Sequence, residues 1–325
     1  MKYFPKKLTM TWIRNSYKEG SLTPAELAGE IVRRAEKYRD YNIWIVAPDL
    51  KRMMGYIEKL PKDMESLPLW GIPFAVKDNI DVAGSPTTAA CPDYAYDPEE
   101  DAAVVKKLIG AGAFPVGKTN LDQFATGLVG TRSPYGEVKN ALDPELISGG
   151  SSSGSAVSVA LGMAAFSLGT DTAGSGRVPA ALNCLVGYKP SLGAWSTKGV
   201  VPACASLDCV TVFANSLEDA EEVNLAARGV DEECCWSRAY KEPLPKLPKK
   251  ICLAKDGVTF YGPYADIYKA KWEQAKKRIE DMGITVEYID YTMFSKAFFM
   301  TDPGWQSAGK ISVISWRATR EKYFR

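Results

Sequence analysis

The stretch Ser148-Gly149-Gly150-Ser151-Ser152-Ser153-Gly154-Ser155 is followed at once by small and apolar residues that run to Phe166. A segment rich in glycine and serine is typical of a flexible linker. A linker, however, does not continue directly into a buried segment, and glycines allow the close approach of backbones that a crowded site requires. We therefore interpret this stretch as part of a site, with a closely packed helix over Ser155–Phe166.

A second turn follows this predicted helix. Asp171–Arg177 reads Asp-Thr-Ala-Gly-Ser-Gly-Arg, a composition typical of a tight strand-to-helix connection. Successive backbone N–H groups around a serine can also form an oxyanion hole. Two serine-rich turns separated by one helix favour a site built around a nucleophilic serine.

The chain contains no histidine, so a serine nucleophile here cannot use imidazole as its base. Lys77 ends the apolar run Ile72–Val76. Most lysines lie on the surface. Burial, however, lowers the pKa of a lysine and makes a neutral amine available as a general base near neutral pH. Lys77 is therefore the candidate base.

Composition excludes several classes of function. The chain has 325 residues, of which 46% are hydrophobic, enough for one large domain or two ordinary ones. Its 40 basic and 39 acidic side chains balance, so we expect no nucleic-acid partner and no membrane association. We expect neither a signal peptide nor a membrane span at the polar N-terminus. The seven cysteines lack a CxxC pair, which with no histidine predicts no metal site, reduced thiols and a cytoplasmic location.

Strands alternate with helices along the chain, which predicts an α/β domain. Thr23-Pro24-Ala25-Glu26 is a capping box that begins a helix reaching Tyr38. The predicted strands cover residues 43–46, 72–76, 114–117, 251–254 and 284–289, and further helices cover 104–109, 268–282 and a segment beginning at 216. Residues 241–250, rich in proline and lysine, are expected to form a surface linker or loop.

Four segments together resemble the amidase signature family of Ser-cisSer-Lys hydrolases, over roughly residues 20–295: Gly71–Asn79, Gly117–Asn120, the Gly/Ser run and Asp171–Arg177. The resemblance implies an α/β amidase-signature fold whose mixed central β-sheet is covered by helices on both faces and is incomplete at the C-terminus. It also implies a cis peptide in the Ser151–Ser152 region. Neither a metal nor an organic cofactor is expected.

By position, the resemblance implies a base, a bridging serine and a nucleophile, namely Lys77, Ser151 and Ser175. It also implies an oxyanion hole from three consecutive N–H groups, those of Thr172, Ala173 and Gly174. In such a site the neutral lysine takes a proton through the bridging serine while the nucleophile attacks an amide carbonyl. Ammonia then leaves, and water hydrolyses the serine ester.

Within the family, Ala173 and Gly176 around Ser175, together with Asn120–Ser133 and Ser206–Cys209, resemble allophanate hydrolases. This implies hydrolysis of allophanate (urea-1-carboxylate) to ammonia and carbon dioxide, with a functional link to a biotin-dependent urea carboxylase. The expected contacts of this small anionic substrate are Gly127 and Arg177. For Arg177 a structural ion pair remains an equal alternative. A homodimer is left open.

Two alternatives to this function remain. The chain could be another amidase-signature protein, such as the amidase component of a glutaminyl-tRNA amidotransferase. It could also be an inactive, truncated remnant, because the family resemblance ends near Phe299 and Met300–Ala308 is unlike family sequence. We therefore expect an incomplete catalytic domain over residues 1–299 and an out-of-frame or divergent tail over 300–325.

The codons from Asp290 to Lys310 test the origin of this break. Back-translating Met300–Ala308 with permitted codons and reading one base earlier yields Tyr-Asp-Gly-Pro-Trp-Val-Ala-Glu-Arg, a motif that allophanate hydrolases carry here, whose tyrosine and arginine are expected to hold the substrate carboxylate. We expect nucleotide sequencing to show one inserted or deleted base near Phe299. A shifted frame that encodes nothing similar to the family would mean that the tail is genuine.

Overall fold

The protein is described by a computed structural model that places residues 2–241, 247–255 and 258–292. The chain divides into two compact units, Met1–Tyr240 and Lys241–Arg325, which are described separately. The predicted domain boundary near residue 299 and the predicted tail over 300–325 lie outside the described residues and stay predictions.

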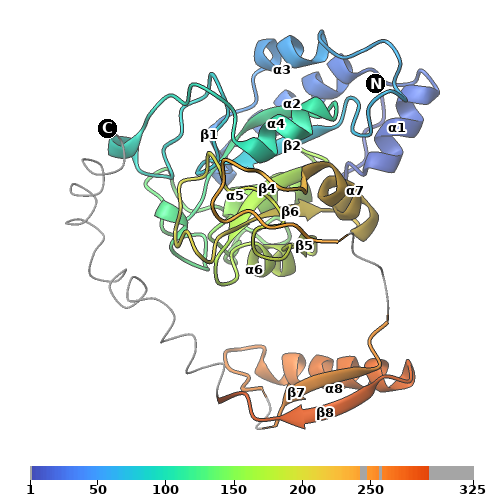
Figure 1. The fold of residues 1–325 in the computed structure, drawn as a ribbon, viewed down its shortest axis with the longest axis vertical. Helices are drawn as coiled ribbons and strands as arrows, with labels where there is room; N and C mark the ends of the chain where they lie inside the picture. Colours follow the sequence, from blue (N-terminus) through green and yellow to red (C-terminus); the bar gives the residue numbers. More distant parts are fainter. Residues whose placement is uncertain (1, 242–246, 256–257, 293–325) are drawn as a thin grey trace. The chain divides into compact units, whose positions relative to one another are not determined.

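The N-terminal unit is built around a mixed, six-stranded sheet (Figure 1). In spatial order its strands are β1 (Trp44–Val46), β3 (Phe114–Thr119), β2 (Pro73–Lys77), β4 (Phe166–Asp171), β6 (Cys209–Ala214) and β5 (Val186–Tyr188). The central strand β2 runs parallel to both of its neighbours, β3 and β4, whereas the outer pairings are antiparallel. The carboxyl ends of the three central strands therefore meet at one edge of the sheet.

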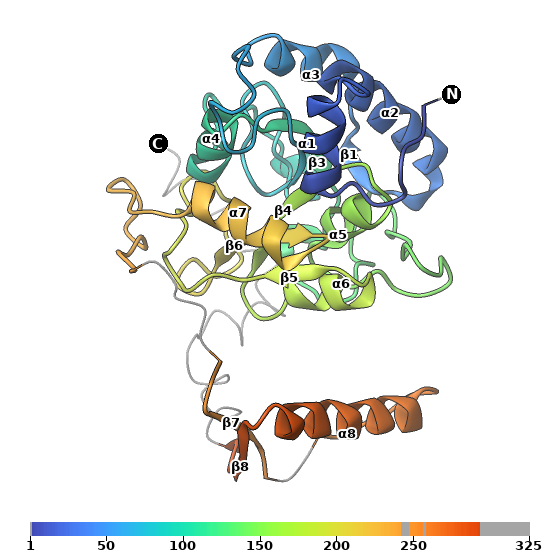
Figure 2. The same cartoon turned by 90° about the vertical axis from the view of Figure 1, so that its right-hand side faces the viewer.

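Helices cover both faces of this sheet (Figure 2). One face carries α5 (Ser153–Ala160) and α6 (Arg177–Leu182), and the other carries α4 (Ala103–Gly110) and α7 (Leu217–Ala227). The remaining helices, nearer the N-terminus, are α1 (Met10–Lys18), α2 (Pro24–Lys37) and α3 (Leu50–Ile57). The predicted α/β class with a mixed, helix-covered sheet is confirmed. None of the helices in the described ranges is long and apolar enough to cross a membrane.

Local sequence explains where several elements begin. The Thr23 hydroxyl accepts the Glu26 N–H at 3.2 Å, and the Glu26 carboxylate accepts the Thr23 N–H at 2.9 Å, so the predicted capping box begins α2. In the centre of the sheet, the rings of Phe74 on β2 and Phe166 on β4 stack with centroids 5.2 Å apart. This stacking joins the two strands whose ends carry the candidate site.

The helix predicted over Ser155–Phe166 is wrong in length. α5 ends at Ala160, and Phe166 already begins β4. Gly162 lies between them with φ of +69°, and a Cβ at this position would come within 2.2 Å of the Lys6 carbonyl oxygen. Small apolar residues show no clear period, so sequence alone did not separate the helix from the buried strand that follows it.

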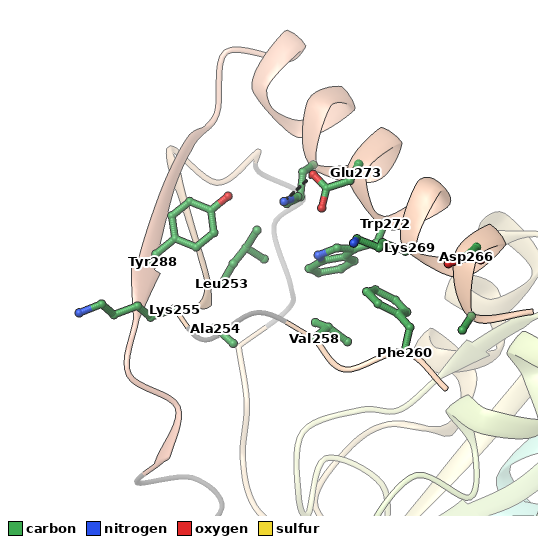
Figure 3. Close-up of a pocket in the computed structure, with 12 residues that line it drawn as sticks. Leu253, Ala254, Lys255, Val258, Phe260, Asp266, Lys269, Trp272, Glu273 and Tyr288 are labelled. Atoms are coloured by element: carbon green, nitrogen blue, oxygen red, sulfur yellow. Dashed lines mark ion pairs between the residues drawn. The ribbon is translucent and has the colours of Figure 1, made fainter. Parts of the chain in front are cut away.

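The C-terminal unit is a single β-α-β arrangement close to the one predicted. Its parallel strands are β7 (Lys250–Ala254) and β8 (Thr285–Ile289), connected by α8 (Ala265–Asp281). Leu253, Phe260 and Trp272 line a cavity of about 540 Å³ beside α8 (Figure 3). The charged groups at this cavity are lysines and carboxylates, including the ion pair of Lys276 with Glu273 at 2.7 Å, and no serine or cysteine among the described residues lines it.

Packing at the start of α5 predicts the effect of one small substitution. A Cβ on Gly154 would lie 2.4 Å from the Ile43 carbonyl oxygen and 2.7 Å from the Asn120 amide nitrogen. Because both neighbours are backbone atoms, Gly154→Ala should lower the free energy of unfolding by about 1–3 kcal/mol in urea titration. The control Gly55→Ala, in α3 with open space around it, should raise it by about 0.5–1 kcal/mol. Equal effects of the two changes would contradict this account.

Candidate active site

The site forms where β2, β4 and the segment before α5 meet. Lys77 is the last residue of β2, and its side chain is completely buried. Its Nζ hydrogen-bonds Ser151 Oγ at 2.8 Å and Thr170 Oγ1 at 2.7 Å. Thr170 lies near the carboxyl end of β4, and Ser151 precedes the first turn of α5. The structure therefore brings the predicted base and the predicted bridging serine into direct contact.

Burial makes the Lys77 amine unusual. Loss of hydration lowers the pKa of Lys77 from 10.5 to about 7. The charges of Asp122, Asp208 and Asp171, in that order, act in the opposite direction and limit this fall. A substantial fraction of Lys77 is consequently neutral near pH 7, as a general base requires.

A second buried lysine shows why Lys77 is the better candidate. Lys118 Nζ lies 3.4 Å from Asp78 Oδ1 and donates to Thr87 Oγ1 at 2.9 Å. Burial lowers the pKa of Lys118 as well, while Asp78 opposes the change. The hydrogen bonds of Lys118 in the described ranges reach no serine, so it has no serine nucleophile or relay within its contacts.

The Gly/Ser run is an ordered part of the site. All of residues 148–155 are buried, which excludes a flexible linker. The cis peptide bond lies between Gly150 and Ser151, so the expected location in the Ser151–Ser152 region is corrected by one bond. Its other hydroxyls bind backbone of the core: Ser152 Oγ donates to the Thr170 carbonyl at 3.2 Å, and Ser155 Oγ donates to that of Leu168 at 2.9 Å.

The turn that carries Ser175 is held by the Asp171 carboxylate. This carboxylate accepts the N–H groups of Gly174 at 2.7 Å, Gly176 at 3.0 Å and Arg177 at 3.3 Å. Burial alone would raise the pKa of Asp171, but the hydrogen bonds and the charge of Arg177 outweigh it and hold this pKa below its usual value. An ionised anchor therefore fixes the backbone between β4 and α6.

The expected set of oxyanion donors differs in one residue. The Gly174 N–H points to Asp171 and is not available to a substrate in this conformation, because the turn closes on its own first residue. Within the described ranges, the structure shows no acceptor for the N–H groups of Thr172, Ala173 and Ser175. The Thr172 hydroxyl donates to Asp208, which orients this residue.

Ser175 is 5% exposed, and its Oγ lies 3.5 Å from the Gly127 carbonyl oxygen. In the described part of the chain no hydrogen bond joins Ser175 to Ser151. Gly127, predicted as a substrate contact, is thus next to the predicted nucleophile. Its role with substrate stays a prediction.

Arg177 forms the ion pair that the sequence left open as an alternative. Its Nε and one terminal nitrogen donate to the two oxygens of Asp171 at 2.9 and 3.0 Å. The side chain remains 56% exposed. The structure thus assigns Arg177 a structural contact, and its predicted contact with substrate stays a prediction.

Two residues of the site were not predicted. Thr170 directly precedes the Asp171–Arg177 turn and contacts Lys77, and Asp122 lies in the Asn120–Ser133 segment and acts on the charge of Lys77. Their neighbours in sequence were recognised, but only the sheet register shows that they meet the lysine. No group of three or more cysteine, aspartate or glutamate side chains suited to a metal ion occurs in the ranges that the structure places.

Comparison with known proteins agrees with this geometry. A family model described as Amidase matches residues 26–300. The chain therefore belongs to the amidase family, and the resemblance found in the sequence is confirmed.

Several relatives narrow the comparison. The chain is 48% identical to the urea amidolyase of Saccharomyces cerevisiae over 255 residues, covering 77% of this chain and 14% of that protein. It is 41% identical to a glutamyl-tRNA(Gln) amidotransferase chain of Symbiobacterium thermophilum over 266 residues, covering 80% and 51%. Among solved structures, a variant of the Kluyveromyces lactis allophanate hydrolase matches with a TM-score of 0.80 and 41% identity, covering 89% and 48%. The chain thus spans between 14% and 51% of the length of these relatives.

The pKa of Lys77 predicts a change in how stability depends on pH. Between pH about 7 and 10.5, the unfolded chain keeps a proton on Lys77 that the folded chain has lost. The free energy of unfolding should therefore rise with pH in this window, and Lys77→Met should remove part of that slope. Urea unfolding of both proteins at several pH values measures it, with the exposed Lys62→Met as the control. Parallel curves for wild type and Lys77→Met would contradict the burial of a neutral amine.

Proposed function

We propose that this chain is an amidohydrolase that hydrolyses allophanate to ammonia and carbon dioxide with Lys77, Ser151 and Ser175. The observation that carries the chemistry is the 2.8 Å hydrogen bond between the buried Lys77 amine and Ser151. The names of the urea amidolyase and allophanate hydrolase relatives support the substrate. A urea amidolyase relative also supports a functional link to a biotin-dependent urea carboxylase.

The proposed reaction follows from the donors and acceptors present. A neutral amine has two N–H groups and one lone pair, so Lys77 can donate to Thr170 while it accepts the Ser151 proton. Ser151 then takes the proton of Ser175, whose Oγ attacks the amide carbonyl carbon. The N–H groups of Thr172 and Ala173 stabilise the negative oxygen that forms.

The second half returns the same proton. Lysine, through Ser151, protonates the leaving nitrogen, the C–N bond breaks, and ammonia departs from a serine ester. Water attacks this ester by the reverse route and restores all three residues. For the relay to operate, the Ser175 hydroxyl must turn from the Gly127 carbonyl towards Ser151, a rotation about one side-chain bond.

We further propose the organisation expected from the sequence, an incomplete amidase-signature domain over residues 1–299 with a tail over 300–325. The end of the family match at residue 300 supports it. A cytoplasmic location without cofactors belongs to the same proposal. It is supported by seven cysteines that form no disulfide in the described residues.

A second candidate function is the glutamine-dependent amidation carried by the name of the amidotransferase relatives. The 41% identity over 80% of the chain favours keeping it in view. The same Lys-Ser-Ser geometry would serve both substrates, so only the substrate distinguishes them. Ammonia release from glutamine, in preference to allophanate, would replace the proposed function by this one.

Ammonia release from allophanate tests the proposal directly. We expect Ser175→Ala to lower the rate at least about 10³-fold, because the nucleophile is lost. The exposed Ser66→Ala should leave the rate unchanged. In wild type, kcat/KM should rise with pH through about 7, because only the neutral form of Lys77 accepts a proton.

The inactive-remnant alternative has its own readout. A fluorophosphonate probe should label wild type at Ser175 and should not label the Ser175→Ala variant. Labelling without turnover of allophanate would mean an active serine with another substrate. No labelling together with no turnover would support a remnant without catalytic function.

A further inference from the structure

Asp122 connects the segments that carry the two predicted serines. It precedes the short 3-10 helix Gln123–Ala125 and is fully buried. Its backbone N–H donates to the Ser151 carbonyl oxygen at 3.0 Å. The bridging serine is thus held from its main chain by Asp122 and from its hydroxyl by Lys77.

The Asp122 carboxylate holds a second segment. Its Oδ2 accepts the Gly130 N–H at 3.1 Å, and its Oδ1 accepts the Arg132 N–H at 2.8 Å. These hydrogen bonds close the loop that begins with Gly127, whose carbonyl oxygen lies 3.5 Å from Ser175 Oγ. One aspartate therefore contacts the backbone of both serine sites.

Two glycines allow the carboxylate to reach this position. A Cβ on Gly150 would lie 2.1 Å from Asp122 Oδ2, and a Cβ on Gly127 would lie 2.5 Å from it. Gly150 directly precedes Ser151, and Gly127 is the contact of Ser175. Any side chain at either glycine would have to displace the carboxylate.

We propose that Asp122 is a positioning residue for the amidase reaction, which sets the distance between Ser151 and Ser175 and places an unpaired negative charge near Lys77. This inference rests on the proposed function of Lys77, Ser151 and Ser175. It adds a residue that contacts neither the reacting atoms nor the substrate.

The charge of Asp122 differs from that of the other two carboxylates that act on Lys77. Asp171 is paired with Arg177. Asp208 accepts the Thr172 hydroxyl and the Ala203 and Cys204 N–H groups, and burial raises its pKa. Among the ion pairs of the described residues, none includes Asp122, whose carboxylate hydrogen bonds come from neutral N–H groups.

Asp122→Asn separates this role from a general structural one. Removing the charge leaves Asp208 and Asp171 as the carboxylates facing Lys77, so the pKa of Lys77 should fall further. The acid limb of kcat/KM should then move to lower pH by about half a unit or more. Loss of one N–H acceptor should also lower kcat about tenfold to hundredfold at the pH optimum.

A matched control is Asp219→Asn. Asp219 is also a buried carboxylate, accepts the Met10 N–H at 3.3 Å, and is not among the groups that shift the pKa of Lys77. It should lower the melting temperature without moving the acid limb. If Asp122→Asn leaves both the acid limb and kcat at their wild-type values, the proposal is overturned.

A second variant keeps the test decisive if Asp122→Asn does not fold. Gly127→Ala displaces the carboxylate but keeps its charge, so kcat should fall about tenfold or more while the acid limb stays within experimental error of wild type. An unchanged kcat would overturn the positioning role.

The rate of fluorophosphonate labelling at Ser175 separates this proposal from the choice of substrate. It should fall in Asp122→Asn and in Gly127→Ala even if the wild type does not hydrolyse allophanate. Slower labelling without allophanate turnover would sustain the role of Asp122 and refute the substrate. Wild type that the probe does not label would overturn both.

Discussion

The site depends on one amine buried without water between the ends of β2 and β4. Lys77 lies among hydroxyl groups, with its hydrogen bonds to Ser151 and Thr170, and has no carboxylate within ion-pair distance in the described residues. An isolated ammonium in such a place is unfavourable, whereas a neutral amine is not. The interior of the sheet therefore selects the form of the lysine that can accept a proton, and any opening that admits water would weaken that selection.

The Gly/Ser composition follows from how closely α5 approaches the sheet. Gly154 has room for no side chain against Ile43 and Asn120, and Ser152 and Ser155 on either side of it each bind a main-chain carbonyl. Hydroxyls at these positions satisfy buried backbone groups that water cannot reach. The same residues that look like a linker in sequence thus form one of the most enclosed parts of the protein.

Sequence could predict Lys77 and Ser151 as partners because the absence of histidine leaves few bases, and because strand ends and turns carry recognisable residue types. It did not predict Thr170 or Asp122, since their contacts arise from the parallel register of β2 with β4 and from a loop that folds back on the Gly/Ser run. Nor could it show that Asp171 would occupy the Gly174 N–H. Such hydrogen bonds depend on turn geometry that composition leaves open.

The geometry defines the reaction more strongly than it defines the substrate. Relatives named for urea and for tRNA-linked amides share this family, and the amine, the two serines and the turn would serve any of these amides. Arg177 already uses Nε and one terminal nitrogen on Asp171, so while that pair stands it can offer a substrate carboxylate only its other terminal nitrogen. A bidentate grip on an anionic substrate must therefore come from other residues. In this chain, specificity for allophanate consequently depends on groups outside the Lys77–Ser151–Ser175 set.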